Sequence, residues 1–83
     1  MNWTLLVSKP AGKRLAKLPA KDQRRIEQAL DELEADPFSG DVKRLQPEGW
    51  RRRVGSYRIF YDLDLHKHFI FVTAITRRSS TTY

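Results

Sequence analysis

Hydrophobic residues recur at helical spacing in the first half of the chain, after a short apolar run at its start. The run Trp3–Val7 is rich in residues that favour extended backbone, which predicts a first strand. Apolar residues then recur every three or four positions from Lys9 to Leu18, and again in a second segment that begins after Pro19 and ends at Asp36-Pro37. Because only a short break separates these two helices, we expect them to form an antiparallel hairpin.

The second half of the chain has the composition of strands separated by turns. We expect a brief strand over Val42–Leu45 and two strands, Trp50–Val54 and Tyr57–Leu63, joined as a β-hairpin by Gly55-Ser56. Residues Phe69–Ile75 are apolar on both faces, as is usual for a central strand. The pattern predicts a single α+β domain over residues 1–83. It consists of an N-terminal strand and an antiparallel helical hairpin packed on one face of a mostly antiparallel sheet of four to five strands.

The two-residue turn determines how the hairpin strands pair. A turn at Gly55-Ser56 places Arg53 opposite Arg58. It also places Arg51 opposite Phe60, and the alternation of side chains along a strand brings all four onto one face. Like charges opposite each other destabilise a sheet, so three guanidinium groups on one face indicate a site for an anion. The alternative is a solvated basic face whose long side chains splay apart.

The same register sends Arg52 to the opposite face, toward the predicted helices. An arginine in that position either extends its charged end to the edge of the sheet or pairs with an acidic side chain of the second helix. Glu27 and Asp31 are the candidate partners. Trp50 and Tyr61 share the face of Arg52, and we expect both rings to contribute to the core.

The charge of the chain is unevenly distributed. The 83 residues carry a formal net charge of +6, and from Gly40 onward nine basic residues outnumber four acidic ones. Basic domains of this size bind phosphate backbones, acidic proteins or anionic membranes, and membranes are disfavoured here because no basic amphipathic helix with a broad apolar face occurs. The chain contains no cysteine and no long apolar run, so we expect a cytoplasmic protein.

These features together resemble the RelE/ParE superfamily of toxins from bacterial type II toxin–antitoxin pairs. The similarity covers nearly the full length of the chain. Its most specific part is the block Trp50–Tyr61, and it also includes Asp36–Gly40, Val42–Leu45, and a closing Arg77-Arg78 with Tyr83. The resemblance implies one of two activities. RelE-like members cut mRNA in the ribosomal A site, whereas ParE-like members poison DNA gyrase.

In the RNA-cutting branch, the resemblance implies that basic residues stabilise the reacting phosphate and that an aromatic residue near the C-terminus stacks on a base. We assign catalytic roles to Arg53, Arg58, Arg78 and Tyr83, and RNA binding to Arg51, Arg77, Lys43 and Arg44. Which residue of the pair Arg77-Arg78 faces the site is left open. Guanidinium groups suit the chemistry, because negative charge builds on the phosphate oxygens when the 2′-hydroxyl attacks the adjacent phosphorus. Arginine stays protonated, so the sequence offers no obvious general base.

Two histidines are the only side chains expected to titrate near neutral pH. His66 and His68 lie at the far end of the predicted hairpin from Gly55-Ser56, and we interpret them as ordinary loop residues. Together with Asp62 and Asp64 they have the residue types of a metal site, but their spacing matches no standard one. We therefore predict neither a metal nor a cofactor.

The sequence favours a RelE-like, ribosome-dependent mRNA endonuclease. The converging arginines and Tyr83 form a phosphate-binding set that gyrase binding does not require. The alternatives are a ParE-like DNA gyrase inhibitor without nuclease activity and a simple RNA-binding module. The expected partners are a cognate antitoxin, mRNA in the ribosomal A site and rRNA, with gyrase in the alternative interpretation and no membrane.

Overall fold

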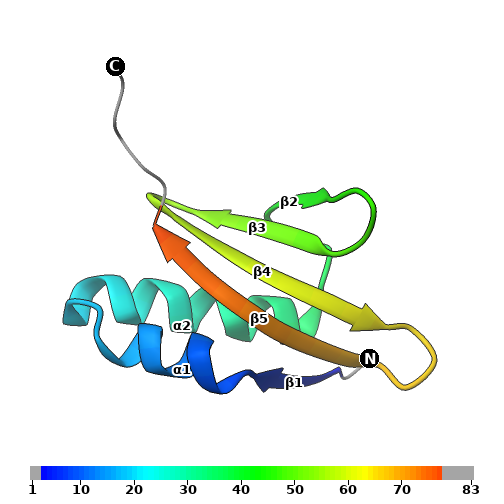
Figure 1. The fold of residues 1–83 in the computed structure, drawn as a ribbon, viewed down its shortest axis with the longest axis horizontal. Helices are drawn as coiled ribbons and strands as arrows, with labels where there is room; N and C mark the ends of the chain where they lie inside the picture. Colours follow the sequence, from blue (N-terminus) through cyan, green and yellow to red (C-terminus); the bar gives the residue numbers. More distant parts are fainter. Residues whose placement is uncertain (1–2, 78–83) are drawn as a thin grey trace.

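Two helices cover one face of a five-stranded sheet in the computed structural model of the protein, which describes residues 3–77 (Figure 1). The elements are β1 (Thr4–Val7), α1 (Lys9–Ala16), α2 (Ala20–Ala35), β2 (Asp41–Arg44), β3 (Trp50–Val54), β4 (Tyr57–Asp64) and β5 (Phe69–Arg77). The strand order is β1-β5-β4-β3-β2; β1 runs parallel to β5, and the other neighbouring strands are antiparallel. The predicted α+β fold is confirmed.

The bounds of several elements differ from the prediction by one or two residues: β1 begins at Thr4, β4 ends at Asp64 and β5 ends at Arg77. Helix α1 ends at Ala16 rather than Leu18, because Pro19 disfavours helical backbone at the residue before it. Strand β2 begins and ends one residue earlier than predicted, at Asp41 and Arg44. Strand β5 has a neighbour on each side, as expected from its apolar sequence, although β4 is the middle strand of the sheet.

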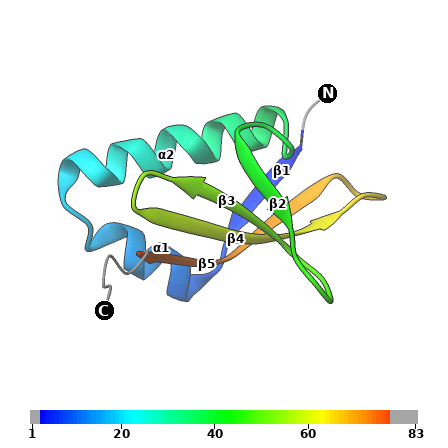
Figure 2. The ribbon, with the colours of Figure 1, turned by 90° about the horizontal axis from the view of Figure 1, so that it is seen from above.

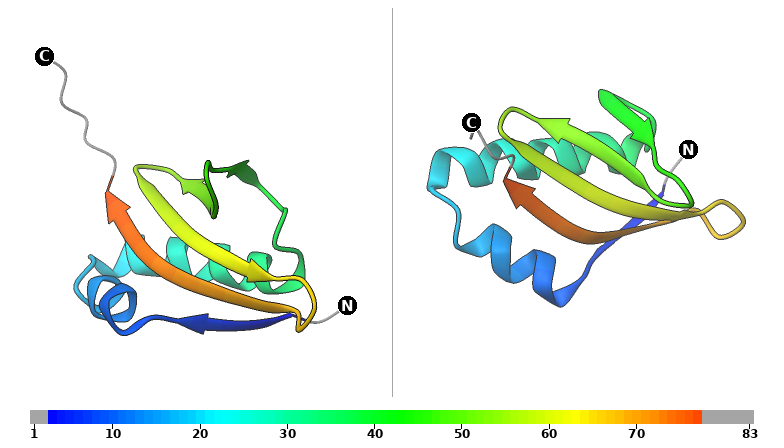
Figure 3. Two further views of the ribbon diagram at one scale, coloured as in Figure 1. Left: turned by 45° about the vertical axis from the view of Figure 1, so that its right-hand side comes forward. Right: turned by 45° about the horizontal axis from the view of Figure 1, so that its top comes forward.

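The core lies between the helices and the sheet. Most of its fully buried side chains come from α2, β4 and β5, with Ala11 from α1, and the largest are Ile26, Leu33, Pro37, Ile59, Tyr61, Ile70 and Val72. Helix α1 is joined to the sheet at its start, where the Ser8 hydroxyl accepts a hydrogen bond from the Ala11 N–H and donates one to the Thr73 carbonyl. Figures 2 and 3 show both helices on the same side of the twisted sheet. The other face of the sheet is therefore open. Neither described helix is long and apolar enough to cross a membrane.

A short segment, Asp36–Gly40, connects α2 to β2 and is held against the sheet by Tyr61. The Tyr61 hydroxyl donates a buried hydrogen bond of 2.6 Å to the carbonyl of Pro37. Burial raises the pKa of Tyr61 to about 12. The phenol is therefore neutral in the folded protein and remains a hydrogen-bond donor at any physiological pH.

We expect Tyr61→Phe to lower the free energy of unfolding by about 1–3 kcal/mol, because the buried carbonyl of Pro37 loses its partner. Tyr57→Phe is the matched control. The Tyr57 hydroxyl donates to Asp22, whose carboxylate is partly exposed and can bind water instead. Urea denaturation should therefore give a larger loss for Tyr61→Phe than for Tyr57→Phe.

The raised pKa of Tyr61 also predicts how stability depends on alkaline pH. A folded-state pKa of about 12 lies above the ordinary value of 10.0, so the unfolded chain releases this proton first. The contribution of Tyr61 is present below pH 10 and is lost as the pH rises toward 12. The Tyr61→Phe variant should show a shallower alkaline loss than the parent; equal slopes would contradict this assignment.

Candidate nucleic-acid interface

Three arginines of the β3–β4 hairpin lie on the open side of the sheet. We refer to Arg51, Arg53 and Arg58 as the arginine face. The predicted pairing is confirmed: Arg53 lies opposite Arg58, and Arg51 lies opposite Phe60. All three arginines are half-buried, since their aliphatic stems lie along the sheet.

The arginine face has donors that lack partners. The Nε atoms of Arg53 and Arg58 are buried and form no hydrogen bond within residues 3–77. The closest acidic group is Asp41 on β2, whose Oδ2 atom lies 3.8 Å from Arg53 Nε. Both of these side chains are substantially exposed, so this ion pair is weak and a phosphate can displace it. The arrangement can therefore accept an anion that supplies acceptors to two facing guanidinium groups.

The other predicted basic residues divide between the two faces of the sheet. Lys43 lies opposite Arg51 and thus adds its charge to the arginine face. Arg44 pairs with Trp50, and its guanidinium carbon lies 5.8 Å from the centre of the Trp50 ring, on the helix side. Arg77 pairs with Tyr57, which is buried on the helix side, so Arg77 does not share the face of Arg58. Arg78 and Tyr83 lie outside the described residues.

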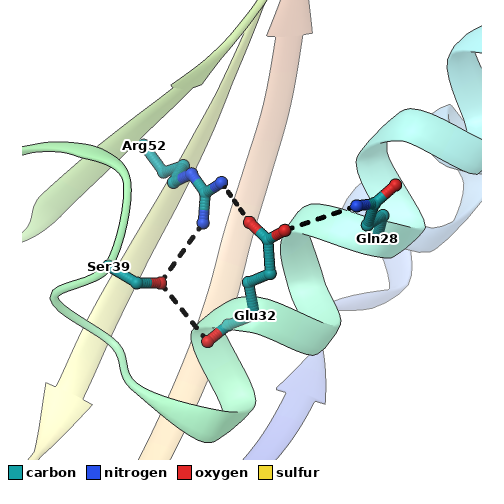
Figure 4. Close-up of polar contacts among 4 residues, drawn as sticks. All are labelled: Gln28, Glu32, Ser39 and Arg52. Carbon is teal, nitrogen blue, oxygen red and sulfur yellow. Dashed lines mark hydrogen bonds and ion pairs between the residues drawn. The ribbon is translucent and has the colours of Figure 1, made fainter.

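Arg52 is the only charged residue buried within the described part of the chain. Its Nη2 atom donates to Glu32 Oε1 at 2.5 Å and its Nη1 atom to Ser39 Oγ at 3.4 Å (Figure 4). The predicted inward orientation and the pairing with an acid of α2 are confirmed, but the acid is Glu32 and not Glu27 or Asp31. Glu32 is the acid whose position on α2 lies beneath β3 next to the Asp36–Gly40 segment. The choice among three acids depends on how α2 packs on the sheet, which the sequence pattern does not specify.

The hydrogen bond and positive charge of Arg52 hold the pKa of Glu32 below its usual range, with a further hydrogen bond from Gln28. Ser39 extends the network, because its hydroxyl donates to the backbone carbonyl of Glu32. Helix α2, the connecting segment and β3 are thus joined through one guanidinium group (Figure 4). This arrangement holds β3 from the side opposite to its two exposed arginines.

Gly40 lies directly against the Arg52 guanidinium group. Its φ is +80°, and a Cβ atom placed on it would lie 2.4 Å from Arg52 Cζ and 2.5 Å from Arg52 Nε. A side chain at position 40 would therefore displace the guanidinium group and break its contacts with Glu32 and Ser39. The segment Asp36–Gly40, which is part of the family resemblance, thus leaves the space that the Arg52 guanidinium group needs.

The two histidines lie away from the arginine face. Both are in the turn between β4 and β5, at the opposite end of β4 from Arg58. The His68 ring stacks on Trp3, with ring centres 4.6 Å apart. Within residues 3–77 no group of three metal-ligating side chains is present.

Sequence reasoning missed a hollow on the open face beside the arginine face. It has a volume of about 310 Å³ and lies between the β2–β3 connection and strands β4 and β5. Its lining includes Phe60, whose ring can stack on a base, and Asp62, whose carboxylate can accept hydrogen bonds. The alternation along β4 could have placed both on one face with Arg58, but the hollow itself depends on the β2–β3 connection.

The fold is that of RelE structures. The chain is similar in structure to the archaeal RelE–RelB complex from Pyrococcus horikoshii, with a TM-score of 0.86, 26% identity, and coverage of 98% of this chain and 100% of that chain. The RelBE2 toxin–antitoxin complex from Mycobacterium tuberculosis gives a TM-score of 0.83 at 22% identity, covering 94% and 100%. The isolated RelE toxin of E. coli gives 0.81 at 21% identity, covering 95% and 87%.

The family assignment follows from the sequence of almost the whole chain. Residues 5–81 match the family model described as the ParE toxin of the type II toxin–antitoxin system parDE. The chain therefore belongs to the ParE toxin family, within the RelE/ParE superfamily of type II toxins. A search of curated proteins gave no significant match.

We expect Gly40→Ala to lower the free energy of unfolding by about 1–3 kcal/mol, because it combines a strained φ with displacement of the Arg52 guanidinium. The control is the same substitution in an Arg52→Leu background. Leucine ends before the position of Cζ, so there the substitution should cost only the backbone strain, about 1 kcal/mol. Chemical denaturation of the four proteins measures the difference. Equal costs in both backgrounds would show that Gly40 does not seat Arg52.

Proposed function

We propose that this protein is a RelE-like toxin that cleaves mRNA on the ribosome without a metal ion. The observation that carries the proposal is the pair of like charges Arg53 and Arg58, which face each other across the hairpin on the open side of the sheet and are both half-buried. Like charges in that position are unfavourable unless an anion lies between them. A phosphodiester of RNA supplies that anion, and the ribose on its 3′-oxygen carries the attacking 2′-hydroxyl.

The reaction forms one bond and breaks one bond at the same phosphorus. The 2′-oxygen attacks, the bond from phosphorus to the 5′-oxygen breaks, and the products are a 2′,3′-cyclic phosphate and a free 5′-hydroxyl. Arg53 and Arg58 stabilise the charge on the equatorial oxygens, and each fixed donor of this kind contributes about 10²–10³-fold in rate. Arg51 and Lys43, on the same face, hold the neighbouring backbone.

The two remaining catalytic roles fall to residues outside the described range. Arg78 contributes further charge stabilisation, and Tyr83 stacks on a base and holds it splayed for in-line attack. Arg44 and Arg77, on the helix side, contact rRNA rather than the reacting phosphate. The arginine face supplies no general base, so positioning and charge account for its contribution while the ribosome supplies the environment for proton transfer.

A DNA gyrase inhibitor is the second candidate, and the match of residues 5–81 to the ParE toxin model favours it. The two candidates differ in where damage occurs after induction. The nuclease produces cuts in translated mRNA that require ribosomes, whereas the gyrase inhibitor produces DNA breaks that require gyrase. Mapping mRNA 5′ ends and DNA breaks in the same induced cells separates them.

We expect Arg58→Ala to reduce ribosome-dependent cleavage by about 10²–10³-fold, because one fixed donor to the phosphorane is lost. Its melting temperature should be unchanged or raised, since the substitution relieves repulsion from Arg53. Arg24→Ala, which removes an exposed arginine from α2, is the control and should cleave normally. Full cleavage by a folded Arg58→Ala protein would reject the anion site.

We further propose that a cognate antitoxin holds the toxin inactive. Several similar structures are described as toxin–antitoxin complexes. A disordered, acidic segment of such a partner is attracted to the basic surface built from Gly40 onward, and apolar side chains supply most of its affinity. The segment would compete with RNA for the same donors.

Electrostatic capture of the antitoxin predicts a particular salt dependence. Raising the salt concentration from 50 to about 500 mM should slow association by at least tenfold while changing dissociation by less than about threefold. Stopped-flow mixing of the purified partners measures both rates. An association rate that is independent of salt would remove electrostatic capture from the proposal and leave the nuclease assignment unchanged.

A further inference from the structure

The hollow beside the arginine face has features that the cleavage proposal does not use. Its floor is formed by β4 and β5 and one wall by the β2–β3 connection. The small residue Ala74 lies opposite Phe60 and leaves space above the sheet, and the strand register shifts directly after this pair, between Phe60 and Tyr61. Thr73 lies at the shift, and its hydroxyl donates to the Phe60 carbonyl at 3.3 Å. At about 310 Å³, the hollow is large enough for one flat ring system.

Phe60 provides an aromatic surface at the floor of this hollow. It is half-buried, and within residues 3–77 no other aromatic ring or guanidinium group stacks on it. Arg58 precedes it by two residues on the same face of β4, which separates the two side chains by about 7 Å along the strand. A single nucleotide spans that distance. Its phosphate can therefore lie on the arginine face while its base stacks on Phe60.

Asp62 follows Phe60 by two residues and continues the same face of β4. Its side chain is exposed, and no hydrogen bond or ion pair engages its carboxylate in the described part of the chain. The side chain has room to act because Gly49 faces it: a Cβ atom at position 49 would lie 3.4 Å from Asp62 Oδ1. Glu48 adds a second carboxylate at the rim, which repels a phosphate from the hollow and directs it to the arginine face.

A carboxylate selects among bases by the donors it meets. It accepts hydrogen bonds and donates none, and its two oxygens match a pair of adjacent N–H groups. Guanine presents such a pair at N1 and N2. Adenine and cytosine present one amino group beside an acceptor nitrogen, and uracil presents one N–H between two carbonyl oxygens. The chemistry of the hollow therefore favours guanine.

We propose that the hollow binds a guanine base of single-stranded RNA, with Phe60 beneath the ring and Asp62 accepting hydrogen bonds from N1 and the N2 amino group. Arg58, Phe60 and Asp62 then contact the phosphate, the ring and the base edge of one nucleotide in that order along β4. The inference rests on the proposed RNA substrate. It assigns Phe60 and Asp62 as specificity residues rather than catalytic ones.

The test compares two short RNAs that differ in one atom group. Each contains a single purine in a uridine context, either guanosine or inosine, which lacks the N2 amino group. A 2′-deoxy sugar before the purine removes the attacking hydroxyl, so binding is measured without cleavage. Fluorescence anisotropy with the purified toxin at low salt should show the guanosine RNA binding about tenfold more tightly.

Three variants locate this preference. Asp62→Asn should reduce the preference to twofold or less, and it should weaken the inosine RNA less than the guanosine RNA, because inosine loses only the N1 contact. Asp31→Asn, which alters an exposed aspartate on α2, should keep the full preference. Phe60→Leu should weaken both RNAs about equally, by roughly tenfold, because stacking does not depend on the N2 amino group.

The outcomes distinguish this inference from the proposed function. A parent protein that binds both RNAs equally, or an Asp62→Asn protein that keeps the full preference, overturns the guanine site whether or not mRNA is cleaved. A preference that disappears only in Asp62→Asn supports the site even if ribosome assays show no cleavage. In that case the nuclease proposal fails and the guanine site stands.

Discussion

The ion pair between Arg52 and Glu32 is the contact on which the arrangement of β3 depends. A buried guanidinium group is costly unless its donors find partners, and here Glu32 and Ser39 accept from the two Nη atoms while Nε has no partner. Gly40 leaves the space that the guanidinium group occupies. The same contacts join the end of α2, the connecting segment and the sheet. Such a pair contributes less to stability than apolar packing would, but its contacts link α2, the connecting segment and β3.

This constraint explains why consecutive arginines on one strand have different roles. Arg51, Arg52 and Arg53 have the same chemistry, and the alternation of the strand alone decides which face each one occupies. Arg52 is neutralised inside the protein, whereas its neighbours remain available to an external anion. The contacts of Arg52 with α2 therefore position the strand that carries Arg51 and Arg53, although Arg52 touches neither of the sites that those two arginines present to solvent.

Much of this arrangement could be predicted from the sequence, because a two-residue turn and a period of two determine the register of a hairpin. The facing of Arg51, Arg53 and Arg58 follows from that register alone. The partner of Arg52 and the hollow at Phe60 could not be predicted, since both depend on how separate elements pack. Arg44 and Arg77 show the same limit: the sequence pattern does not decide which way they face, and the exact strand pairing places both on the helix side.

The parallel pairing of β1 with β5 sets the order in which the domain can form. Thr4 pairs with Phe69, so the first strand can join the sheet only after almost the whole chain has been made. The β3–β4 hairpin requires only local contacts, and non-local pairings form late because the intervening chain must first be ordered. An incomplete chain that stops before β5 therefore contains the arginines but lacks Ile70, Val72 and Ile75, which bury the helices. The arginine face is thereby held in a folded domain only when the strand that completes the core has been made.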